Sequence, residues 1–362
     1  MNLEPILRND ERASLRLREL YRRYGYTYFK MSKFEEYDLY VRNKSFLVSQ
    51  DVLTFTDTDG KLMALKPDVT LSIIKNTGEE NGALQKVYYN ETVYRVSPTS
   101  HGYQEIMQTG LECVGDLDLY AMGEVVELAA KSLEVIGEEY LLDLGHLGFV
   151  AGLLDSADVA PADQKQLLNW LGEKNVPAIS ASEKEMGLPP QVTDILCKLA
   201  GLYGTPEEIL PELERMVRSE RMKLALEELK GVCSLLKSYQ EHLRLDFSIV
   251  NDMNYYNGII FRGYLPQLPN GILSGGRYDS LLKKMGKKAG AIGFAVYLNE
   301  LERLMESHSS WDCDVLLLYD KNTPIDAVAR KAQECRRAGM SVRVEQQIPK
   351  GLSVREIREV KG

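Results

Sequence analysis

Hydrophobic residues recur at helical spacing in three parts of the chain. Near the N-terminus the apolar line includes Leu17 and Tyr21, and Gly25 follows as a residue favoured just beyond a helix end. The segment 121–136 carries a similar apolar stripe along one face. From about 148 to 242 nearly every stretch has the pattern of a helix, with clear start signals. This last segment is therefore predicted to be an all-helical insertion.

Patterns typical of strands occupy much of the remaining chain. Residues 86–115 contain two β-rich stretches, joined by a polar loop at 97–102 that carries proline and glycine. Beyond Trp311, an apolar strand, a helix near 325–339 and a second strand predict one small βαβ unit. Together these elements predict an α+β fold.

The order of the elements predicts how the chain is divided. At 362 residues it is long enough for a main domain and one or two smaller ones. The core is expected to comprise residues 1–147 and 243–308, with the helical insertion at 148–242 between them. The βαβ unit is expected to form a small C-terminal domain at 311–362.

The stretch 251–300 holds much of the candidate binding chemistry. Its pattern predicts a first strand that presents the aromatic pair Tyr255 and Tyr256, and later a glycine-rich turn at 274–277. Adjacent glycines permit backbone torsions closed to other residues and let a ligand approach the main chain closely. The expected floor of a binding site is therefore Gly275, Gly276 and Arg277.

Two further segments offer polar groups whose role the pattern leaves open. Pro67 forces an extended or turn geometry before a predicted helix, so Asp68 lies at a helix N-terminus, as a cap or as a binding group. Gln108, Gly110 and Glu112 alternate along a predicted strand and so share one face. That face is either a solvated sheet surface or the lining of a polar pocket.

Composition narrows the class of protein. Hydrophobic content of 44% and charged content of 27% are ordinary for a soluble globular protein. The net charge of -9 argues against a large nucleic-acid footprint. The N-terminus lacks a hydrophobic signal core, and no run reaches the roughly 18 apolar residues of a membrane span, so a cytoplasmic location is expected. Scattered histidines and cysteines predict no metal site and no disulfide framework, the cysteines being Cys113, Cys197, Cys233, Cys313 and Cys335. No cofactor is expected.

Five segments, in the same order, resemble the class II aminoacyl-tRNA synthetases of the histidyl type. That family's LRPE-x-T segment is similar to LKPDVT, and its motif 2 is similar to ETVYRVSPTSHGYQEIMQTGLECVG. Its two histidine-specific signatures resemble MNYYNGIIF and SGGRYDSLL, and its motif 3 resembles AIGFAVYLNEL. The resemblance covers most of residues 1–310 and implies an antiparallel sheet flanked by helices.

The resemblance implies that the amino-acid pocket of the family is kept. Carboxylates accept charge-assisted hydrogen bonds from the ammonium and imidazole of histidine, and tyrosines supply both ring contact and a hydroxyl. By this resemblance, histidine binding is assigned to Asp68, Thr70, Arg95, Gln108, Glu112, Tyr255 and Tyr256.

The same resemblance implies that the catalytic apparatus is not kept. Activation of histidine with ATP requires cations opposite the phosphates, and arginine suits this role. The family's arginine before the Tyr-Tyr signature aligns with Asn251, and its motif 3 arginine aligns with Glu300, whose carboxylate would repel a triphosphate. Arg303 lies one helical turn beyond Glu300, on nearly the same face. Adenylate formation is therefore expected to be crippled.

A synthetase-like core with these losses and a shortened anticodon-binding-like domain is similar to the regulatory subunits of ATP phosphoribosyltransferase. That family implies no catalysis by this chain, a short-form catalytic partner in a hetero-octamer, and the first step of histidine biosynthesis as the regulated reaction. Histidine would be the effector, bound in the pocket or at the subunit interface. Dimerisation through about residues 40–60 is expected, with no tRNA and no membrane as partner.

Two other functions stay open from the sequence. The first is a histidyl-tRNA synthetase with a divergent active site. The second is a stand-alone synthetase paralogue that binds tRNA or another protein without the transferase.

Overall fold

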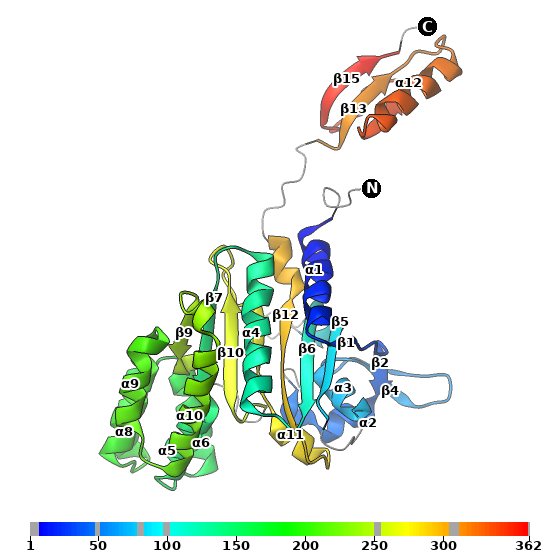
Figure 1. Ribbon diagram of the computed structural model, residues 1–362. Coiled ribbons are helices and arrows are strands. Elements are labelled where there is room, and N and C mark those ends of the chain that lie inside the picture. The colour runs from blue at the N-terminus through cyan, green and yellow to red at the C-terminus, as the bar shows by residue number, and fades with distance from the viewer. Residues whose placement is uncertain are drawn as a thin grey trace. The chain divides into compact units, whose positions relative to one another are not determined.

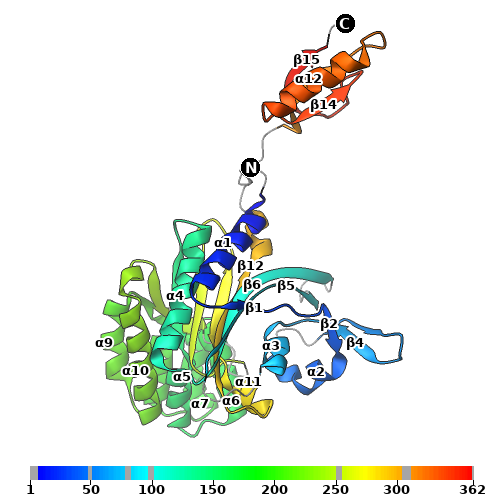
Figure 2. The ribbon, with the colours of Figure 1, turned by 45° about the vertical axis from the view of Figure 1, so that its right-hand side comes forward.

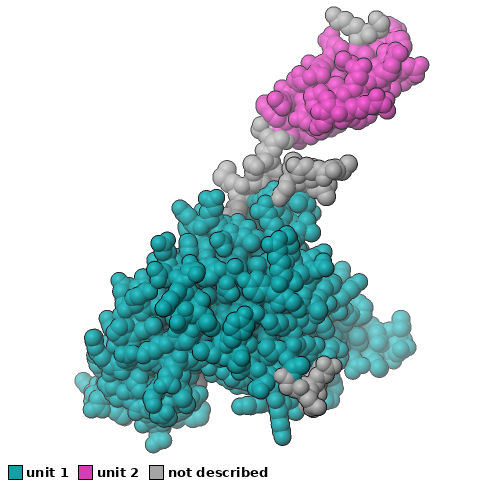
Figure 3. Space-filling view, viewed as in Figure 1, with its two compact units in different colours: residues 1–304 teal, residues 305–362 magenta. Residues whose placement is uncertain are grey.

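The computed structural model divides into two compact units, residues 1–304 and 305–362, which are coloured separately in Figure 3. No helix in the described part of the chain is long and apolar enough to cross a membrane. The described residues are 7–47, 51–77, 83–96, 102–249, 255–303 and 311–360.

The first unit is organised around one large sheet (Figure 1). Its described strands are β1 (Thr27–Tyr28), β5 (Gln85–Val96), β6 (Tyr103–Gly115), β7 (Leu141–His146), β8 (Tyr203–Gly204), β9 (Leu243–Asp246), β10 (Ile259–Tyr264), β11 (Leu273–Arg277) and β12 (Gly290–Tyr297). They lie side by side in the order β1-β5-β6-β12-β11-β10-β7-β9-β8. Within this order only β1 with β5 and β7 with β9 pair in parallel. The antiparallel sheet expected of the α+β fold is thus confirmed.

The register across the central strands sorts the side chains onto two faces, because directly opposed residues of an antiparallel pair point to the same side. One row is apolar and belongs to the hydrophobic core: Leu111, Phe294, Gly275, Phe261 and Leu144. The adjacent row points the other way and is small or polar: Gly110, Ala295, Ser274, Arg262 and Asp143. At these central positions the sheet therefore packs the main core on one face and presents small or polar groups on the other.

Two long helices, α1 (Asn9–Arg23) and α4 (Leu119–Ile136), pack on the apolar face, side by side in Figures 1 and 2. The buried ring of Tyr21 from α1 meets Phe294 of the sheet edge-on, with ring centroids 6.0 Å apart. On α4, Asp118 caps the first turn by accepting a hydrogen bond from the Ala121 amide at 2.7 Å.

The helices predicted between 148 and 242 are present, but the segment is not all-helical as predicted, because it also contributes strand β8 to the large sheet. They are α5 (Leu147–Asp155), α6 (Pro161–Gly172), α7 (Val176–Glu185), α8 (Pro190–Gly201), α9 (Pro206–Met216) and α10 (Glu220–Leu235). A capping box opens α9, where Glu208 accepts hydrogen bonds from the amide and the hydroxyl of Thr205 at 2.9 and 3.0 Å. Helix α10 packs on α4 and α5 and so seats this helical segment against the core of the first unit.

A small antiparallel sheet lies beside the large one (Figure 2). Its strands, in the spatial order β2-β4-β3, are β2 (Phe34–Glu36), β4 (Leu62–Leu65) and β3 (Thr54–Thr56). The short helices nearby along the chain are α2 (Tyr37–Arg42), η2 (Lys44–Phe46) and α3 (Thr70–Asn76). The remaining helices of this unit are α11 (Asp279–Lys284), η3 (Lys237–Tyr239), η4 (Phe247–Ile249) and η5 (Leu298–Arg303).

The aromatic pair does not lie on a strand, so that prediction is wrong. Tyr255 and Tyr256 occupy the turn that precedes β10. The backbone amide of Asn257 donates to the Arg277 carbonyl at 2.9 Å, which ties this turn to the end of β11 before regular pairing starts.

The predicted glycine-rich turn at 274–277 is also wrong, because these residues form strand β11. A Cβ atom on Gly275 would lie 2.4 Å from the Cβ of Phe294, and one on Gly276 would lie 2.8 Å from the ring of Tyr256. The glycines are explained by close packing within a strand rather than by a turn.

The second unit holds the predicted βαβ unit and one further strand. Its elements are β13 (Cys313–Leu318), α12 (Ile325–Arg337), β14 (Val342–Glu345) and β15 (Val354–Glu359), with strand order β14-β13-β15 and parallel pairing. The sequence did not indicate β15, because four of its six residues are charged and little apolar alternation is visible.

Candidate functional site

A cavity of about 230 Å³ opens on the polar face of the large sheet. This volume is below the roughly 300–1,000 Å³ typical of sites for drug-sized ligands, so the cavity suits a small molecule. All of the residues proposed from the sequence to bind histidine line it: Asp68, Thr70, Arg95, Gln108, Glu112, Tyr255 and Tyr256. The lining also includes Tyr89, Arg262, Ser274, Tyr278, Gly293, Ala295 and Tyr297. Segments far apart in the sequence therefore meet at one site.

Glu112 of β6 is buried in the cavity and is held through both of its carboxylate oxygens. It is 2% exposed, and its two oxygens accept hydrogen bonds from the hydroxyls of Thr70 at 2.9 Å and Tyr278 at 2.5 Å. A Cβ atom on Gly293 would lie 1.7 Å from Glu112 Oε2, so only glycine fits opposite the carboxylate. Burial raises the pKa of Glu112 to about 8, although the two hydroxyls act to lower it. A ligand that donates N–H groups would favour the ionised carboxylate.

Asp68 serves as a helix cap and lines the cavity as well. Its Oδ1 accepts a hydrogen bond from the Leu71 amide at 2.8 Å, in the first turn of α3. Burial raises the pKa of Asp68, whereas the Leu71 amide and the charge of Arg95 act to lower it. The two roles that the sequence left open for this residue are therefore compatible.

The segment that carries Asp68 is tied down on both sides. Arg95 Nε donates to the Pro67 carbonyl at 2.9 Å. Lys66 is fully buried and its ammonium pairs with Glu91 of β5 at 2.6 Å, while burial lowers its pKa. These two contacts hold the start of α3 against β5, and they fix where the Asp68 carboxylate enters the cavity.

Three tyrosine rings form one wall of the cavity. The ring centroids of Tyr255 and Tyr256 are 4.7 Å apart, and those of Tyr255 and Tyr278 are 5.6 Å apart. Burial raises the pKa of Tyr255 and of Tyr278 well above its ordinary value, so both hydroxyls stay protonated at neutral pH. This wall offers flat apolar surface and hydroxyl groups to a ligand.

Arg262 and Ser274 also line the cavity, although neither was predicted from the sequence as a site residue. They are directly opposed on β10 and β11, and Arg262 also opposes Asp143 on β7. Burial raises the pKa of Asp143 to about 7, with the charge of Asp246 adding to this effect and nearby cations, Arg262 included, opposing it. A single charged residue in the otherwise apolar run Ile259–Gly263 was the available signal for Arg262.

The predicted floor of the site is not where the sequence placed it. Gly275, Gly276 and Arg277 are absent from the residues that line the cavity, and Ser274 and Gly293 line it from the neighbouring positions. Because side chains alternate along a strand, Gly275 and Arg277 point away from Ser274. The ring of Tyr256 packs directly over Gly276, so the absence of a side chain at position 276 makes room for this tyrosine.

A second hollow, of about 430 Å³, adjoins the cavity and shares Tyr297 with it. It is lined by Gln104, Glu105, Ile106, Gly271, Tyr297, Asn299 and Glu300. These lining residues, all in the described part of the chain, include two glutamates and neither lysine nor arginine. Asn251 and the side chain of Arg303 lie outside the residues that the structure describes. A polyphosphate in this hollow would meet carboxylates.

Among the described residues, neither the cavity around Glu112 nor the hollow around Glu300 has the side chains of a metal centre. Within the ranges given above, no group of three or more His, Cys, Asp or Glu side chains could hold a metal ion. The five cysteines are free thiols, and four of them are buried.

The antiparallel sheet, its covering helices and the polar cavity define a protein of the class II aminoacyl-tRNA synthetase type. A family model described as histidyl-tRNA synthetase matches residues 3–301. Curated relatives named ATP phosphoribosyltransferase regulatory subunit match nearly the whole chain. The relative from Oceanobacillus iheyensis is 29% identical over 89% of this chain and 81% of its own length. The relative from Clostridium kluyveri is 30% identical over 90% of this chain and 86% of its own length.

Solved structures agree with these matches. An ATP phosphoribosyltransferase regulatory subunit/histidyl-tRNA synthetase from Bacillus halodurans superposes with a TM-score of 0.79 at 25% identity, covering 98% of this chain and 94% of that one. A chain of the ATP phosphoribosyl transferase (HisG:HisZ) complex from Thermotoga maritima shares the fold, with a TM-score of 0.62 at 20% identity, covering 80% of this chain and 97% of that one. The chain belongs to the histidyl-tRNA synthetase family and, within it, to the group of ATP phosphoribosyltransferase regulatory subunits.

Proposed function

We propose that this chain is a non-catalytic regulatory subunit of ATP phosphoribosyltransferase, required for the activity and the histidine feedback of the first step of histidine biosynthesis. The observation that carries the proposal is a small polar cavity with two buried carboxylates beside a hollow lined by Glu105 and Glu300. The cavity suits an amino acid, whereas the hollow is unsuited to the phosphates of ATP.

The cavity supports histidine as the effector. The carboxylates of Asp68 and Glu112 are buried and are placed to accept hydrogen bonds from an ammonium or an imidazole. Arg95 and Arg262 line the same cavity and offer positive charge to the carboxylate of an amino acid. Histidine would regulate the complex to the extent that its affinity differs between two states of the assembly.

The proposed partner is the short-form catalytic subunit of ATP phosphoribosyltransferase, in a hetero-octamer in the cytoplasm, without tRNA. The name of the Thermotoga complex supports a partnership with a transferase subunit. Self-association as a dimer through about residues 40–60 is part of the proposal. It is supported by the neighbouring pair Phe34 and Phe55, which stack edge to face at 5.7 Å and are 47% and 40% exposed.

ATP–pyrophosphate exchange in the presence of histidine tests the proposal against its main rival. The purified chain is expected to show no exchange above background, while an active histidyl-tRNA synthetase assayed in parallel serves as the positive control. Robust turnover by this chain would instead establish the divergent synthetase. Failure to co-purify with the short transferase, together with a lack of exchange, would favour a stand-alone paralogue.

A further inference from the structure

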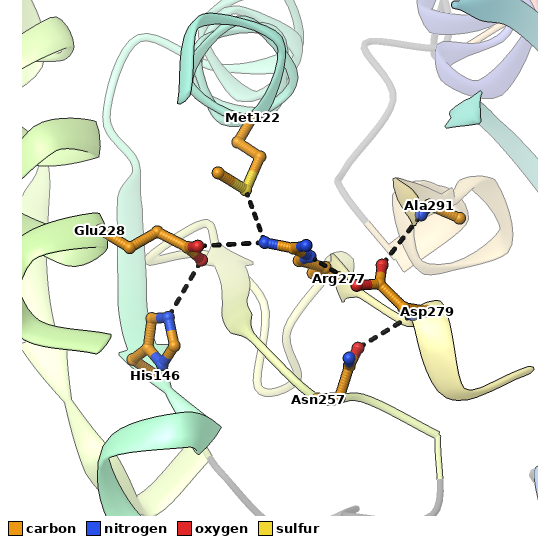
Figure 4. Close-up of polar contacts among 7 residues, drawn as sticks. All are labelled: Met122, His146, Glu228, Asn257, Arg277, Asp279 and Ala291. Carbon is orange, nitrogen blue, oxygen red and sulfur yellow. Dashed lines mark hydrogen bonds and ion pairs between the residues drawn. The ribbon is translucent and has the colours of Figure 1, made fainter. Parts of the chain in front are cut away.

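Glu228 of α10 lies at a polar junction between the helical segment and the large sheet (Figure 4). Its Oε1 is 3.0 Å from Nε2 of His146 at the end of β7, and its Oε2 accepts a hydrogen bond from Nη1 of Arg277 at 3.0 Å. Burial acts to raise the pKa of Glu228, but the hydrogen bonds and charges of His146 and Arg277 hold it below its usual value. Glu228 is therefore an anion at neutral pH.

Arg277 extends this junction to three further segments (Figure 4). Its Nε donates to Asp279 Oδ2 at 2.9 Å, and its Nη1 lies 3.5 Å from the sulfur of Met122 on α4. The other oxygen of Asp279 accepts from the Ala291 amide at 3.0 Å, and the Asp279 amide donates to Asn257 Oδ1 at 2.9 Å. Arg277 and Asp279 are therefore fixed from several sides.

Tyr278 stands between these two clamped residues and points into the cavity. Its hydroxyl donates to Glu112 at 2.5 Å, and its amide donates to the Ala291 carbonyl at 2.8 Å. A shift of Arg277 would move the backbone on which Tyr278 is carried. The Tyr278 hydroxyl that binds Glu112 is thus linked to Glu228 in two steps. Tyr278 follows Arg277 directly along the chain, and Arg277 forms an ion pair with Glu228.

The junction is not needed to anchor α10, because the helix already buries an apolar stripe of Met222, Ala225, Leu226, Leu229, Val232 and Cys233. A partly buried ion pair contributes little net stability, since desolvation offsets its attraction, but it does fix geometry. The side chain of Glu228 is 20% exposed and that of Arg277 is 25% exposed, so their ion pair is partly buried in this sense.

We propose that Glu228 is a positioning residue of the amino-acid cavity, which it reaches through Arg277 and Tyr278. The helical segment thereby sets how firmly the Glu112 carboxylate is held, and so sets the affinity for a ligand with ammonium or imidazole N–H groups. This inference rests on the proposed function, in which the cavity binds histidine.

The test compares Glu228→Gln with Glu227→Gln, which removes the same charge from an exposed position on the same helix. Calorimetric titration with L-histidine is expected to show about tenfold weaker binding in Glu228→Gln, as for loss of one charge-assisted hydrogen bond, and unchanged binding in the control. Equal affinity in both variants would overturn the proposal.

A double-mutant cycle separates positioning from a general structural effect. Tyr278→Phe removes the hydroxyl on Glu112, so adding Glu228→Gln to it is expected to weaken histidine binding little further. Fully additive losses would overturn the proposed route through Tyr278.

Hydrogen exchange tests the coupling without any ligand. The amides of Asp279 and Ala291, which bond to the junction, are expected to exchange faster in Glu228→Gln than in Glu227→Gln. Equal exchange would overturn the positioning role. If wild type fails to bind L-histidine while exchange still changes, the proposed effector is wrong and the junction stands.

Discussion

The cavity around Glu112 and the hollow around Glu300 are both lined by Tyr297 but differ in chemistry. In the cavity each carboxylate has named donors, from Thr70 and Tyr278 to Glu112 and from Leu71 to Asp68. In the hollow two glutamates line the space that the family resemblance assigns to nucleotide chemistry. Binding of an amino acid and its activation therefore depend on separate groups, so one can persist without the other.

The cavity is expected to be much less tolerant of added volume than the hollow. A Cβ at position 293 would lie 1.7 Å from Glu112 Oε2 and 2.4 Å from the Leu111 carbonyl, so Gly293→Ala should lower the free energy of unfolding by about 3 kcal/mol. Gly271→Ala, in the hollow, meets its first neighbour at 3.2 Å and should cost less than about 1 kcal/mol. Urea denaturation measures both, and equal losses would remove the contrast.

Removal of the central carboxylate should abolish ligand binding. Glu112→Ala deletes the charged partner of the ligand and leaves the buried hydroxyls of Thr70 and Tyr278 without their acceptor, so affinity for L-histidine should fall about 100-fold or more. Glu105→Ala in the hollow is the matched control and should bind as wild type does. Calorimetry decides, and an unchanged affinity in Glu112→Ala would place the effector elsewhere.

Reversal of one charge in the hollow should strengthen the binding of a nucleotide there. Glu300→Arg replaces repulsion of a triphosphate by attraction and should strengthen ATP binding about tenfold at low ionic strength, without producing adenylate. Glu300→Gln, which only removes the charge, should give a smaller gain. Titration of ATP measures both variants; if neither differs from wild type, the hollow is not the nucleotide subsite.

The smallest expected effect is a release of protons when the ligand binds, which follows from the raised pKa of Glu112. Since this pKa is about 8, Glu112 is mostly protonated at pH 7, and N–H donors from a ligand favour its ionised form. Binding should therefore release up to about one proton at pH 7, and affinity should rise toward pH 8. Titrations in buffers of different ionisation enthalpy measure the release, which Glu112→Gln should lack.

The residues that line the cavity from single segments of the chain were predicted better than those contributed by neighbouring strands. Asp68, Gln108 and Glu112 could be assigned because each lies in a contiguous segment whose pattern or resemblance is readable by itself. Arg262 and Ser274 were missed because their place depends on the register of neighbouring strands, which is a tertiary property.

The glycine-rich segment shows why the rest could not be predicted. Adjacent glycines suggest a turn, but Gly275 and Gly276 are there because Phe294 and the Tyr256 ring approach from outside the segment. The junction of Glu228 with Arg277 joins residues that are 49 positions apart, and no local pattern marks such a pair. Local patterns predict elements, whereas close packing between elements decides the details of the site.

The central claim is tested most directly by adding the purified chain to the short ATP phosphoribosyltransferase subunit and measuring the rate of phosphoribosyl transfer with and without L-histidine. The rate is expected to rise with added chain until the partner is saturated, and L-histidine is then expected to suppress it. A rate that changes with neither the chain nor L-histidine would show that this chain is not the regulatory subunit.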